Sequence, residues 1–156
     1  MVRSGNIDSK DIEILEALQA NARAPLSEIG RSIGLSQPAI SERVKRLEEA
    51  GVIEGYSARI SPRALGLALM AIVRLRTSHE HIKTCLKKFS EIPHIMEVHR
   101  VTGEDCFVLK VLVPAPEDLE TIVDRIGGFG AVTTSLVLRS EPVRAIGREL
   151  IGRRVD

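Results

Sequence analysis

The 156-residue sequence contains only two cysteines and no long apolar run, and each shortage excludes a class of protein. Cys85 and Cys106 form no Cys-X-X-Cys pair, so we expect reduced thiols packed as small apolar side chains rather than a disulfide framework. No apolar stretch reaches the length that spans a bilayer, and the N-terminus MVRSGNIDSKD has no apolar signal region. We therefore expect a cytoplasmic protein that does not enter a membrane.

The sequence also has little net charge. A formal charge of +1 is too small to attract nucleic acid indiscriminately. Any affinity for DNA must come from local charge, which Arg43, Lys45 and Arg46 supply. The hydrophobic content of 44% is enough for a core in one domain or in each of two small ones.

Residues of the kinds found in catalytic or metal sites do not converge in this sequence. His79, Glu80 and His81 lie at the start of an expected helix, where positions two apart point about 160° away from each other. We expect a polar helix N-terminus there. Neither His94 nor His99 stands beside a serine or cysteine nucleophile in a local motif. The sequence therefore predicts no enzyme, no cofactor and no metal site.

The most informative stretch runs from Leu26 to Leu47, where two short amphipathic helices surround a Gly-Leu-Ser turn. Ile29 and Ile33 form an apolar i, i+4 pair in the first helix. That helix ends at Gly34, a residue type that tolerates positive φ at a helix C-terminus. This arrangement predicts a helix-turn-helix motif.

The second helix of the motif begins after Ser36, whose hydroxyl we expect to cap the first turn. Pro38 suits that turn because it lacks only an amide with no intrahelical partner. Ile40, Val44 and Leu47 share one face, and the opposite face is small, polar and basic, as suits a DNA major groove. We expect this outward face and its flanks to hold base edges and phosphates. The expected base-edge residues are Gln37, Ser41 and Lys45, and the expected phosphate-binding residues are Ser36, Arg43 and Arg46.

Two ordinary helices of a bundle with a solvated charged face would produce the same local pattern. The surrounding chain favours DNA binding, because a helix from Asp8 to about Asn21 precedes the motif and a turn segment from Gly51 to Tyr56 follows it. A third helix in front and a β-turn segment behind predict a winged helix-turn-helix domain over residues 1–60.

The second half of the chain changes character. Ser61-Pro62 predicts a helical turn that ends at Gly66, within a linker over residues 61–67. Residues 68–142 follow the order strand, helix, strand, strand, helix, strand. The expected elements span 69–76, 80–92, 94–102, 106–113, 117–127 and 131–139. The fold class is therefore α+β, with a winged helix-turn-helix followed by a βαββαβ, ferredoxin-like domain.

Residues 143–156 form a basic tail that we expect to be solvated or loosely packed, although it could also touch DNA phosphates. Its basic residues include Arg144, Arg148, Arg153 and Arg154. In the first strand of the βαββαβ domain, the run 69–76 alternates so that Arg74 and Arg76 make one face more polar. With helices on one side only, the other side of the sheet needs a partner, and the simplest partner is a second copy of the chain.

Taken together, these segments resemble the Lrp/AsnC, or feast/famine, family of prokaryotic transcription regulators. The resemblance extends over about residues 8 to 140 and is carried, in order, by GLSQPAISERVKRLEEAGVIEGYSARI, SPRALGLALMAIVRL, HRVTGEDCFVLKV and TTSLVL. It implies a sequence-specific transcription regulator whose second domain is ACT-like, similar to the amino-acid-binding domains of some metabolic enzymes. It also implies dimers that associate further, often to octamers, with a small effector, commonly an amino acid, bound between dimers.

The loop around Gly103 has two interpretations. It is either a polar hairpin turn, or a site whose amides and carboxylates hold the carboxylate and ammonium of an amino acid. The resemblance favours the site, completed by hydroxyls from the last strand of a neighbouring subunit. Its expected residues are Thr102, Gly103, Glu104, Asp105, Thr133, Thr134 and Ser135. Many family members have approximately Gly-Asp-Tyr-Asp in this loop, whereas this chain places Cys106 at the acidic position nearest the strand.

Two classes of function remain, with an amino-acid-metabolising enzyme a distant third because no catalytic constellation is present. The first is a DNA-binding regulator that responds to a ligand. The second is a metabolite-binding or architectural protein that compacts DNA without strong sequence specificity. Gln37 and Lys45 can hydrogen-bond adenine and guanine edges, which favours the first.

Overall fold

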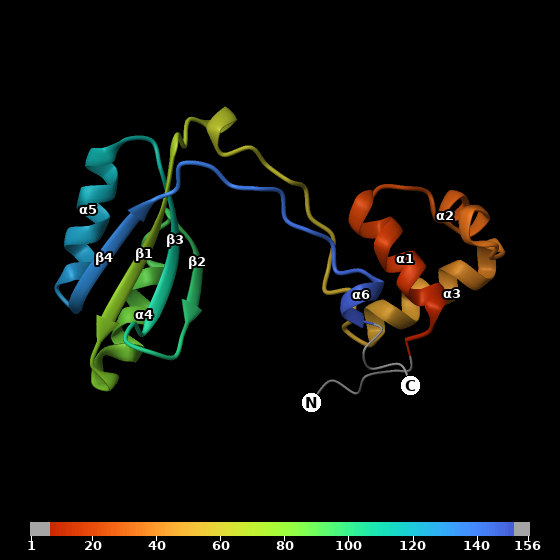
Figure 1. The fold of residues 1–156 in the computed structure, drawn as a ribbon, viewed down its shortest axis with the longest axis horizontal. Helices are drawn as coiled ribbons and strands as arrows, with labels where there is room; N and C mark the ends of the chain where they lie inside the picture. The colour runs from red at the N-terminus through yellow and green to blue at the C-terminus, as the bar shows by residue number, and fades with distance from the viewer. Residues whose placement is uncertain (1–6, 152–156) are drawn as a thin grey trace. The chain divides into compact units, whose positions relative to one another are not determined.

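The computed structural model describes residues 7–151, and the chain divides into two compact units (Figure 1). The first unit comprises residues 1–59 and 142–156, and the second comprises residues 60–141. The C-terminal segment therefore belongs to the same unit as the helix-turn-helix. Arg153 and Arg154 of the expected basic tail lie outside the described residues.

The first unit contains α1 (Ser9–Ala20), α2 (Leu26–Ile33), α3 (Gln37–Glu49) and, from the end of the chain, α6 (Arg148–Ile151). The expected helices are confirmed, and α1 begins with a reciprocal capping box. The Asp8 carboxylate accepts a hydrogen bond from Asp11 N–H at 2.9 Å, and the Asp11 carboxylate accepts one from Asp8 N–H at 3.1 Å. Both exchanges satisfy amides that have no partner within the helix.

The helix-turn-helix depends on two glycines, Gly34 at the end of α2 and Gly30 where α2 meets α3. Gly34 ends α2 with a φ of 74°, as its position predicts. A Cβ atom on Gly30 would lie 2.9 Å from Leu35 O and 3.3 Å from Ile40 Cγ2, so glycine allows α2 to approach α3. The apolar faces of the three helices form one core. Its buried residues are Ile14, Leu18, Ile29, Ile40, Val44 and Leu47.

Two expectations about the first unit are wrong. Ser36 occupies the N-cap position of α3, but its hydroxyl makes no capping hydrogen bond. Pro38 removes one of the two amides that such a hydroxyl could accept from, because proline has no N–H. The β-wing is also missing, since residues 51–60 of the described chain contain no strand. Val52 N–H and Ile53 N–H instead donate to Leu47 O at 2.9 and 3.1 Å, and both side chains pack against the helical core.

The C-terminal tail is more ordered than expected, because it docks on α1. Gln19 donates from its side-chain amide to Ile146 O at 2.9 Å and accepts from Ile146 N–H at 2.8 Å. Arg148 N–H donates to Glu16 Oε1 at 3.0 Å. These hydrogen bonds from side chains of α1 to backbone groups hold the segment before α6 and the start of α6 on α1.

The second unit is a four-stranded antiparallel sheet in the order β2-β3-β1-β4, preceded by the expected helical turn, η1 (Arg63–Leu65). Gly66 ends that turn with a φ of 83°. The expected helix over 80–92 is divided into a 3₁₀ turn and an α-helix, while the last strand is shorter than expected. The observed elements are β1 (Leu69–Thr77), η2 (His79–His81), α4 (Ile82–Ser90), β2 (Ile95–Arg100), β3 (Phe107–Val113), α5 (Pro116–Gly127) and β4 (Gly130–Leu136).

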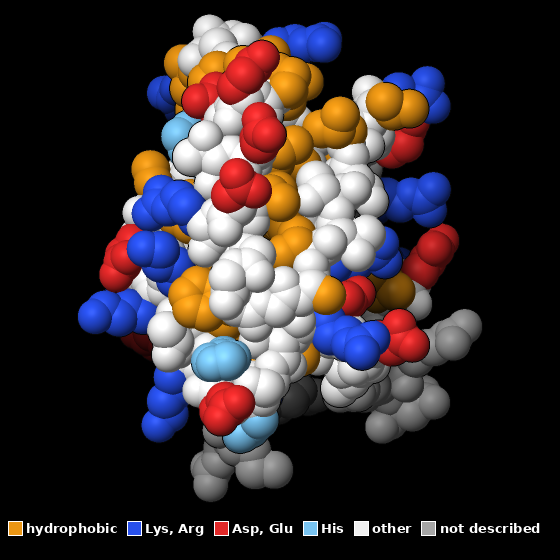
Figure 2. Space-filling view, turned by 90° about the vertical axis from the view of Figure 1, so that its left-hand side faces the viewer, with side chains coloured by type: hydrophobic (Ala, Val, Ile, Leu, Met, Phe, Trp, Pro, Cys, Tyr) orange, Lys and Arg blue, Asp and Glu red, His pale blue; other side chains and the backbone are white. Residues whose placement is uncertain are grey.

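Helices α4 and α5 cover one face of this sheet and enclose its core (Figure 1). Val73 and Leu75 of β1 are fully buried in that core, with Phe89 of α4 and Ile126 of α5. On the α5 side of the unit, acidic and basic side chains surround a narrow band of hydrophobic ones (Figure 2). This side therefore has no single sign of charge that would mark it as a DNA-binding surface.

The other face of the sheet, which we call the open face, carries charged side chains in the middle of the strands. Alternation along β1 places Arg74 and Arg76 there, because the neighbouring Val73 and Leu75 point into the core. Lys110 Nζ and Glu97 Oε1 are paired across β3 and β2 at 2.8 Å. This hydrogen bond, with one to His99, holds the pKa of Glu97 below its ordinary value. The open face is thus mixed, because the β1–β3 register also places the apolar residues Met70, Ile72, Val108 and Leu112 on it.

Candidate DNA-binding surface and effector site

The outward face of α3 displays the side chains that the sequence assigned to DNA. Gln37, Ser41 and Lys45 are exposed, whereas Ile40 and Val44 of the same helix are buried. Lys45 forms an ion pair with Glu49 at 3.7 Å, but the two side chains are 75% and 67% exposed, so water screens the pair. Lys45 can therefore exchange this partner for a base or a phosphate at little cost.

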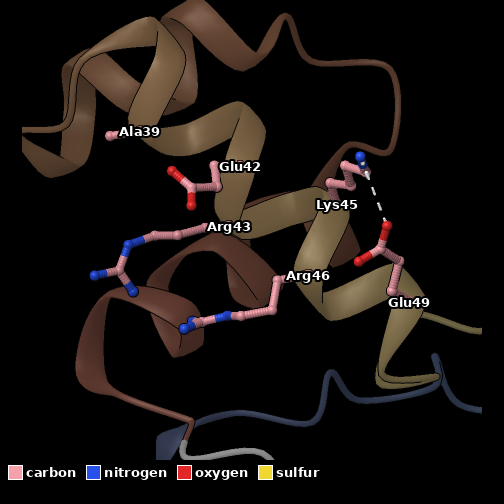
Figure 3. A pocket seen from close by; sticks show the side chains of 6 residues that line it. All are labelled: Ala39, Glu42, Arg43, Lys45, Arg46 and Glu49. Carbon is pink, nitrogen blue, oxygen red and sulfur yellow. Dashed lines mark ion pairs between the residues drawn. The ribbon is translucent and has the colours of Figure 1, made fainter.

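An open hollow of ≈ 590 Å³ lies along α3, where it is lined by Lys45 but not by Gln37 or Ser41. Figure 3 shows the dashed ion pair between Lys45 and Glu49, while Arg43 and Arg46 extend side by side in another direction. The lining mixes both signs of charge. Its residues are Ala39, Glu42, Arg43, Lys45, Arg46 and Glu49.

The two arginines of α3 are held by acidic residues of α1. Arg43 Nη1 donates to Asp8 Oδ2 at 2.7 Å and to Asp11 Oδ1 at 2.8 Å. Arg46 Nη2 donates to both oxygens of Asp11, at 2.8 and 2.6 Å. Asp11 is completely buried, and these bonds provide the donors that a buried carboxylate requires.

This network fixes α3 against α1. Partial burial opposes ionisation of Asp8, but the hydrogen bonds from Arg43 and Asp11 N–H hold its pKa below the ordinary value. The same contacts with Asp8 and Asp11 raise the pKa of Arg43. The sequence interpretation did not identify Asp11 as part of the site. The position of Asp11 was a signal, because a residue one helical turn before Ile14 and Leu15 lies on the apolar face of α1.

Ser36 is exposed at the start of α3. Arg43 and Arg46 differ in the exposed fraction of their side chains. The side chain of Arg46 is 54% exposed, whereas that of Arg43 is 27% exposed. A phosphate could therefore reach Arg46 without breaking its bonds to Asp11, because a guanidinium has five donors. The structure thus leaves Gln37, Ser41 and Lys45 exposed on α3, while Arg43 and Arg46 extend in another direction, toward Asp8 and Asp11 of the first unit.

The expected effector loop joins β2 to β3. Thr102, Gly103 and Glu104 are exposed, and Asp105 is half-buried. Gly103 adopts a φ of 112°, a conformation that side-chain-bearing residues rarely adopt. Asp105 Oδ2 lies 3.9 Å from Nε of Arg74, a residue of β1 that the sequence interpretation did not assign to the site.

The expected residues of the last strand lie on two different faces. Thr133 pairs with Arg74 and Ser135 pairs with Ile72, so both are on the open face. Thr134 pairs with Val73 and points to the opposite side. Within one chain, Arg74 therefore lies between the loop residue Asp105 and the strand residue Thr133. The sequence signal for Arg74 was the alternation of charged and apolar residues at the end of MAIVRLR, residues 70–76.

Cys106, which stands where we expected an acidic residue, makes a hydrogen bond of its own. Both cysteines are free, as expected. Cys106 is half-buried, and its thiol donates to Thr77 O at 3.1 Å. Cys85 is buried in the core, and that burial raises the pKa of its thiol. Cys106 therefore anchors the start of β3 to the end of β1.

The polar start at His79–His81 is confirmed, because Ser78 Oγ lies 3.1 Å from both Glu80 Oε1 and His81 Nδ1. Across residues 7–151, no three histidine, cysteine or acidic side chains gather so as to hold a metal ion. Over the same residues, every helix is too short or too polar to cross a membrane.

Comparison with known proteins agrees with the two units. Residues 7–48 match the AsnC-type helix-turn-helix domain, and residues 70–144 match the Lrp/AsnC ligand binding domain. The HTH-type transcriptional regulator LrpA of Pyrococcus horikoshii is 37% identical over 128 residues, which cover 81% of this chain and 91% of that protein.

Solved structures show the same arrangement of elements. LrpC of B. subtilis aligns with a TM-score of 0.84 and 26% identity, covering 90% of this chain and 100% of that one. AsnC of E. coli aligns with a TM-score of 0.81 and 28% identity, covering 90% of this chain and 97% of that one.

Proposed function

The chain belongs to the Lrp/AsnC family of transcription regulators, and from this we infer that it binds specific DNA sequences and changes that binding when an amino acid occupies its second unit. The family consists of regulators rather than enzymes. We propose that it acts in the cytoplasm, where DNA lies in prokaryotic cells such as those of its relatives.

The outward face of α3 carries the proposal of sequence-specific binding. Gln37, Ser41 and Lys45 are exposed on a helix that ion pairs with the buried Asp11 hold in place. Amide and ammonium groups can hydrogen-bond the edges of adenine and guanine, whereas contacts to phosphate only position the protein. We assign Ser36, Arg43 and Arg46 to phosphates. Because Glu42 and Glu49 repel phosphates on the same face, nonspecific compaction of DNA is the poorer fit.

The proposed regulator acts as a dimer or a larger assembly such as an octamer. A partly apolar open face, with Ile72 at its middle, supports association through the sheet. Two linked recognition helices would then read half-sites about one helical turn apart, roughly 34 to 36 Å.

The proposed effector is an amino acid held at the loop Thr102–Asp105, with hydroxyls from β4. A ligand that fits one assembly better than another shifts the population toward it, by no more than its difference in affinity. This is how binding at the sheet would change binding at DNA.

Selection of bound sequences from random duplexes, with and without each of the common L-amino acids, tests the function. We expect one enriched motif whose recovery changes with at least one amino acid. Recovery of random sequences under every condition would overturn sequence-specific regulation and favour an architectural role.

A further inference from the structure

We propose that the Asp8 carboxylate competes with DNA phosphates for Arg43, and that this competition limits the affinity of the chain for DNA of any sequence. The proposal rests on the DNA binding proposed above and concerns the phosphate contact assigned to Arg43. Asp8 caps α1, and the competition gives it a second role. It acts as a counter-charge within the DNA-binding unit and makes no contact with DNA itself.

The guanidinium group of Arg43 is already bound by two carboxylates. Its Nη1 donates to Asp8 Oδ2 at 2.7 Å and to Asp11 Oδ1 at 2.8 Å. Both distances are typical of hydrogen bonds between ionised groups, which are roughly twice as strong as neutral ones. Arg43 accordingly extends away from the exposed Lys45 (Figure 3). A phosphate that reaches Arg43 must therefore replace a carboxylate or bind beside one that repels it.

The charges around α3 show how far this neutralisation extends. The two arginines of α3 and the two aspartates that bind them carry no net charge together. The hollow along α3 adds the positive charge of Lys45 but also the negative charges of Glu42 and Glu49. The recognition helix therefore presents less positive charge to DNA than its own basic residues suggest, and Asp8 contributes to that reduction.

The two aspartates differ in what they would lose if Arg43 moved to a phosphate. The side chain of Asp11 is completely buried, so loss of a donor would leave a buried charge poorly paired, which is strongly destabilising. The side chain of Asp8 is 46% exposed, so water can replace Arg43 at little cost. Asp8 is therefore the partner that Arg43 can exchange, whereas Asp11 holds the helices together.

Asp8→Asn tests the competition, because asparagine caps a helix about as well as aspartate but carries no charge. Binding of the full-length chain is measured at several salt concentrations, on random-sequence duplexes and on the sequence enriched by selection. Asp8→Asn should bind random duplexes about three- to tenfold more tightly at low salt, with a salt slope steeper by about one, because Arg43 neutralises one more phosphate. The enriched sequence should gain by the same factor, since phosphate contacts carry no sequence information.

Two further variants separate the competition from general effects. Glu13→Gln removes the same charge from α1, but Glu13 pairs with Lys10 and Arg148 and with neither arginine of α3. It should leave the salt slope unchanged. Arg43→Gln, added to Asp8→Asn, should remove the whole gain in affinity, because the competition acts through Arg43. A loss of stability in Asp8→Asn could only weaken DNA binding, so a gain cannot come from lost folding.

The outcomes separate the competition from the function. If Asp8→Asn has the affinity and salt slope of Glu13→Gln, or if the gain survives Arg43→Gln, the competition is wrong while DNA binding stands. If the wild type binds random and enriched duplexes equally well but Asp8→Asn still gains affinity through Arg43, the competition stands and sequence-specific regulation is overturned. If neither the wild type nor Asp8→Asn binds any duplex, both are overturned.

Discussion

Arg46 of the recognition helix donates to both oxygens of the buried Asp11 carboxylate, with N–O distances of 2.8 and 2.6 Å. Arg43 adds a third donor at 2.8 Å. The orientation of α3 relative to α1 is therefore set by charge as well as by the apolar core, so the side chains that we propose to face DNA depend on an acidic residue of α1.

We expect Asp11→Ala to destabilise the first unit by about 1–3 kcal/mol, because it removes the acceptor of two arginines and one half of the capping box. The cost stays below that of a fully buried pair because both guanidinium groups can reach water. Denaturant unfolding followed by helical circular dichroism measures the change. Glu49→Gln, which breaks an exposed pair of α3, should change stability by less than about 0.5 kcal/mol; equal losses in both variants would contradict the role of Asp11.

Lys45→Ala and Arg46→Ala should impair DNA binding in different ways. Lys45→Ala should cost about 1–3 kcal/mol at the preferred sequence and relax specificity, whereas Arg46→Ala should weaken all sequences alike and reduce the salt slope by about one. Binding isotherms on specific and random duplexes at several salt concentrations measure both effects.

Arg46 also binds Asp11, so a loss of DNA binding in Arg46→Ala could come from lost stability, and the experiment needs a control for this. Arg46→Lys keeps the charge near a phosphate but loses the forked contact with Asp11. If the phosphate role is correct, Arg46→Lys should retain most of the salt slope even where its unfolding midpoint falls. Identical losses on specific and random DNA for Lys45→Ala and Arg46→Ala would refute the division between base and phosphate contacts.

Light scattering at micromolar concentration should show at least a dimer. Ile72→Asp, which replaces an apolar side chain of the open face with a charged one, should weaken that association. It should also lower the affinity for a two-half-site operator, because two linked DNA-binding units bind with a higher effective concentration. Leu86→Asp, on the exposed side of α4, is the matched control. A monomeric wild type with full operator affinity would rule out the dimer.

Stability should fall at acid pH partly through Asp8. Its folded-state pKa is lowered, so its ionised form contributes stability above the ordinary pKa of about 4, and that contribution is lost as the pH falls through the folded-state value. Asp8→Asn should therefore reduce the difference in unfolding midpoint between pH 7 and pH 3. Glu54→Gln, an exposed carboxyl after α3, serves as control. A pH dependence unchanged by Asp8→Asn would show that other carboxylates account for it.

Gly103→Val should abolish the effect of an amino acid on DNA binding or assembly, since valine does not tolerate a φ of 112° and the loop would change shape. The helix-turn-helix should remain folded, because Gly103 belongs to the second unit. Calorimetry and DNA binding on the same preparation measure both effects. Wild-type ligand affinity in this variant would place the effector elsewhere.

The sequence determined the local elements and the exposed face of α3, because both follow from short-range rules. The spacing of Ile40, Val44 and Leu47 is enough to place Gln37, Ser41 and Lys45 outside, and the alternation along β1 is enough to separate Val73 from Arg74. Gly34 could be assigned to a helix end because few other residues adopt positive φ.

Only the tertiary structure decided which distant residues meet. Asp11 and Arg46 are 35 positions apart, and Arg74 meets Asp105 only because β1 and β3 pair in one register. The capping hydrogen bond of Ser36 and the β-wing failed as predictions. Pro38 removes one of the two amides from which the Ser36 hydroxyl could accept, and the described residues 51–60 contain no strand. Periodicity reveals which face a residue occupies, but a buried ion network depends on the packing of whole helices, and no local pattern encodes that packing.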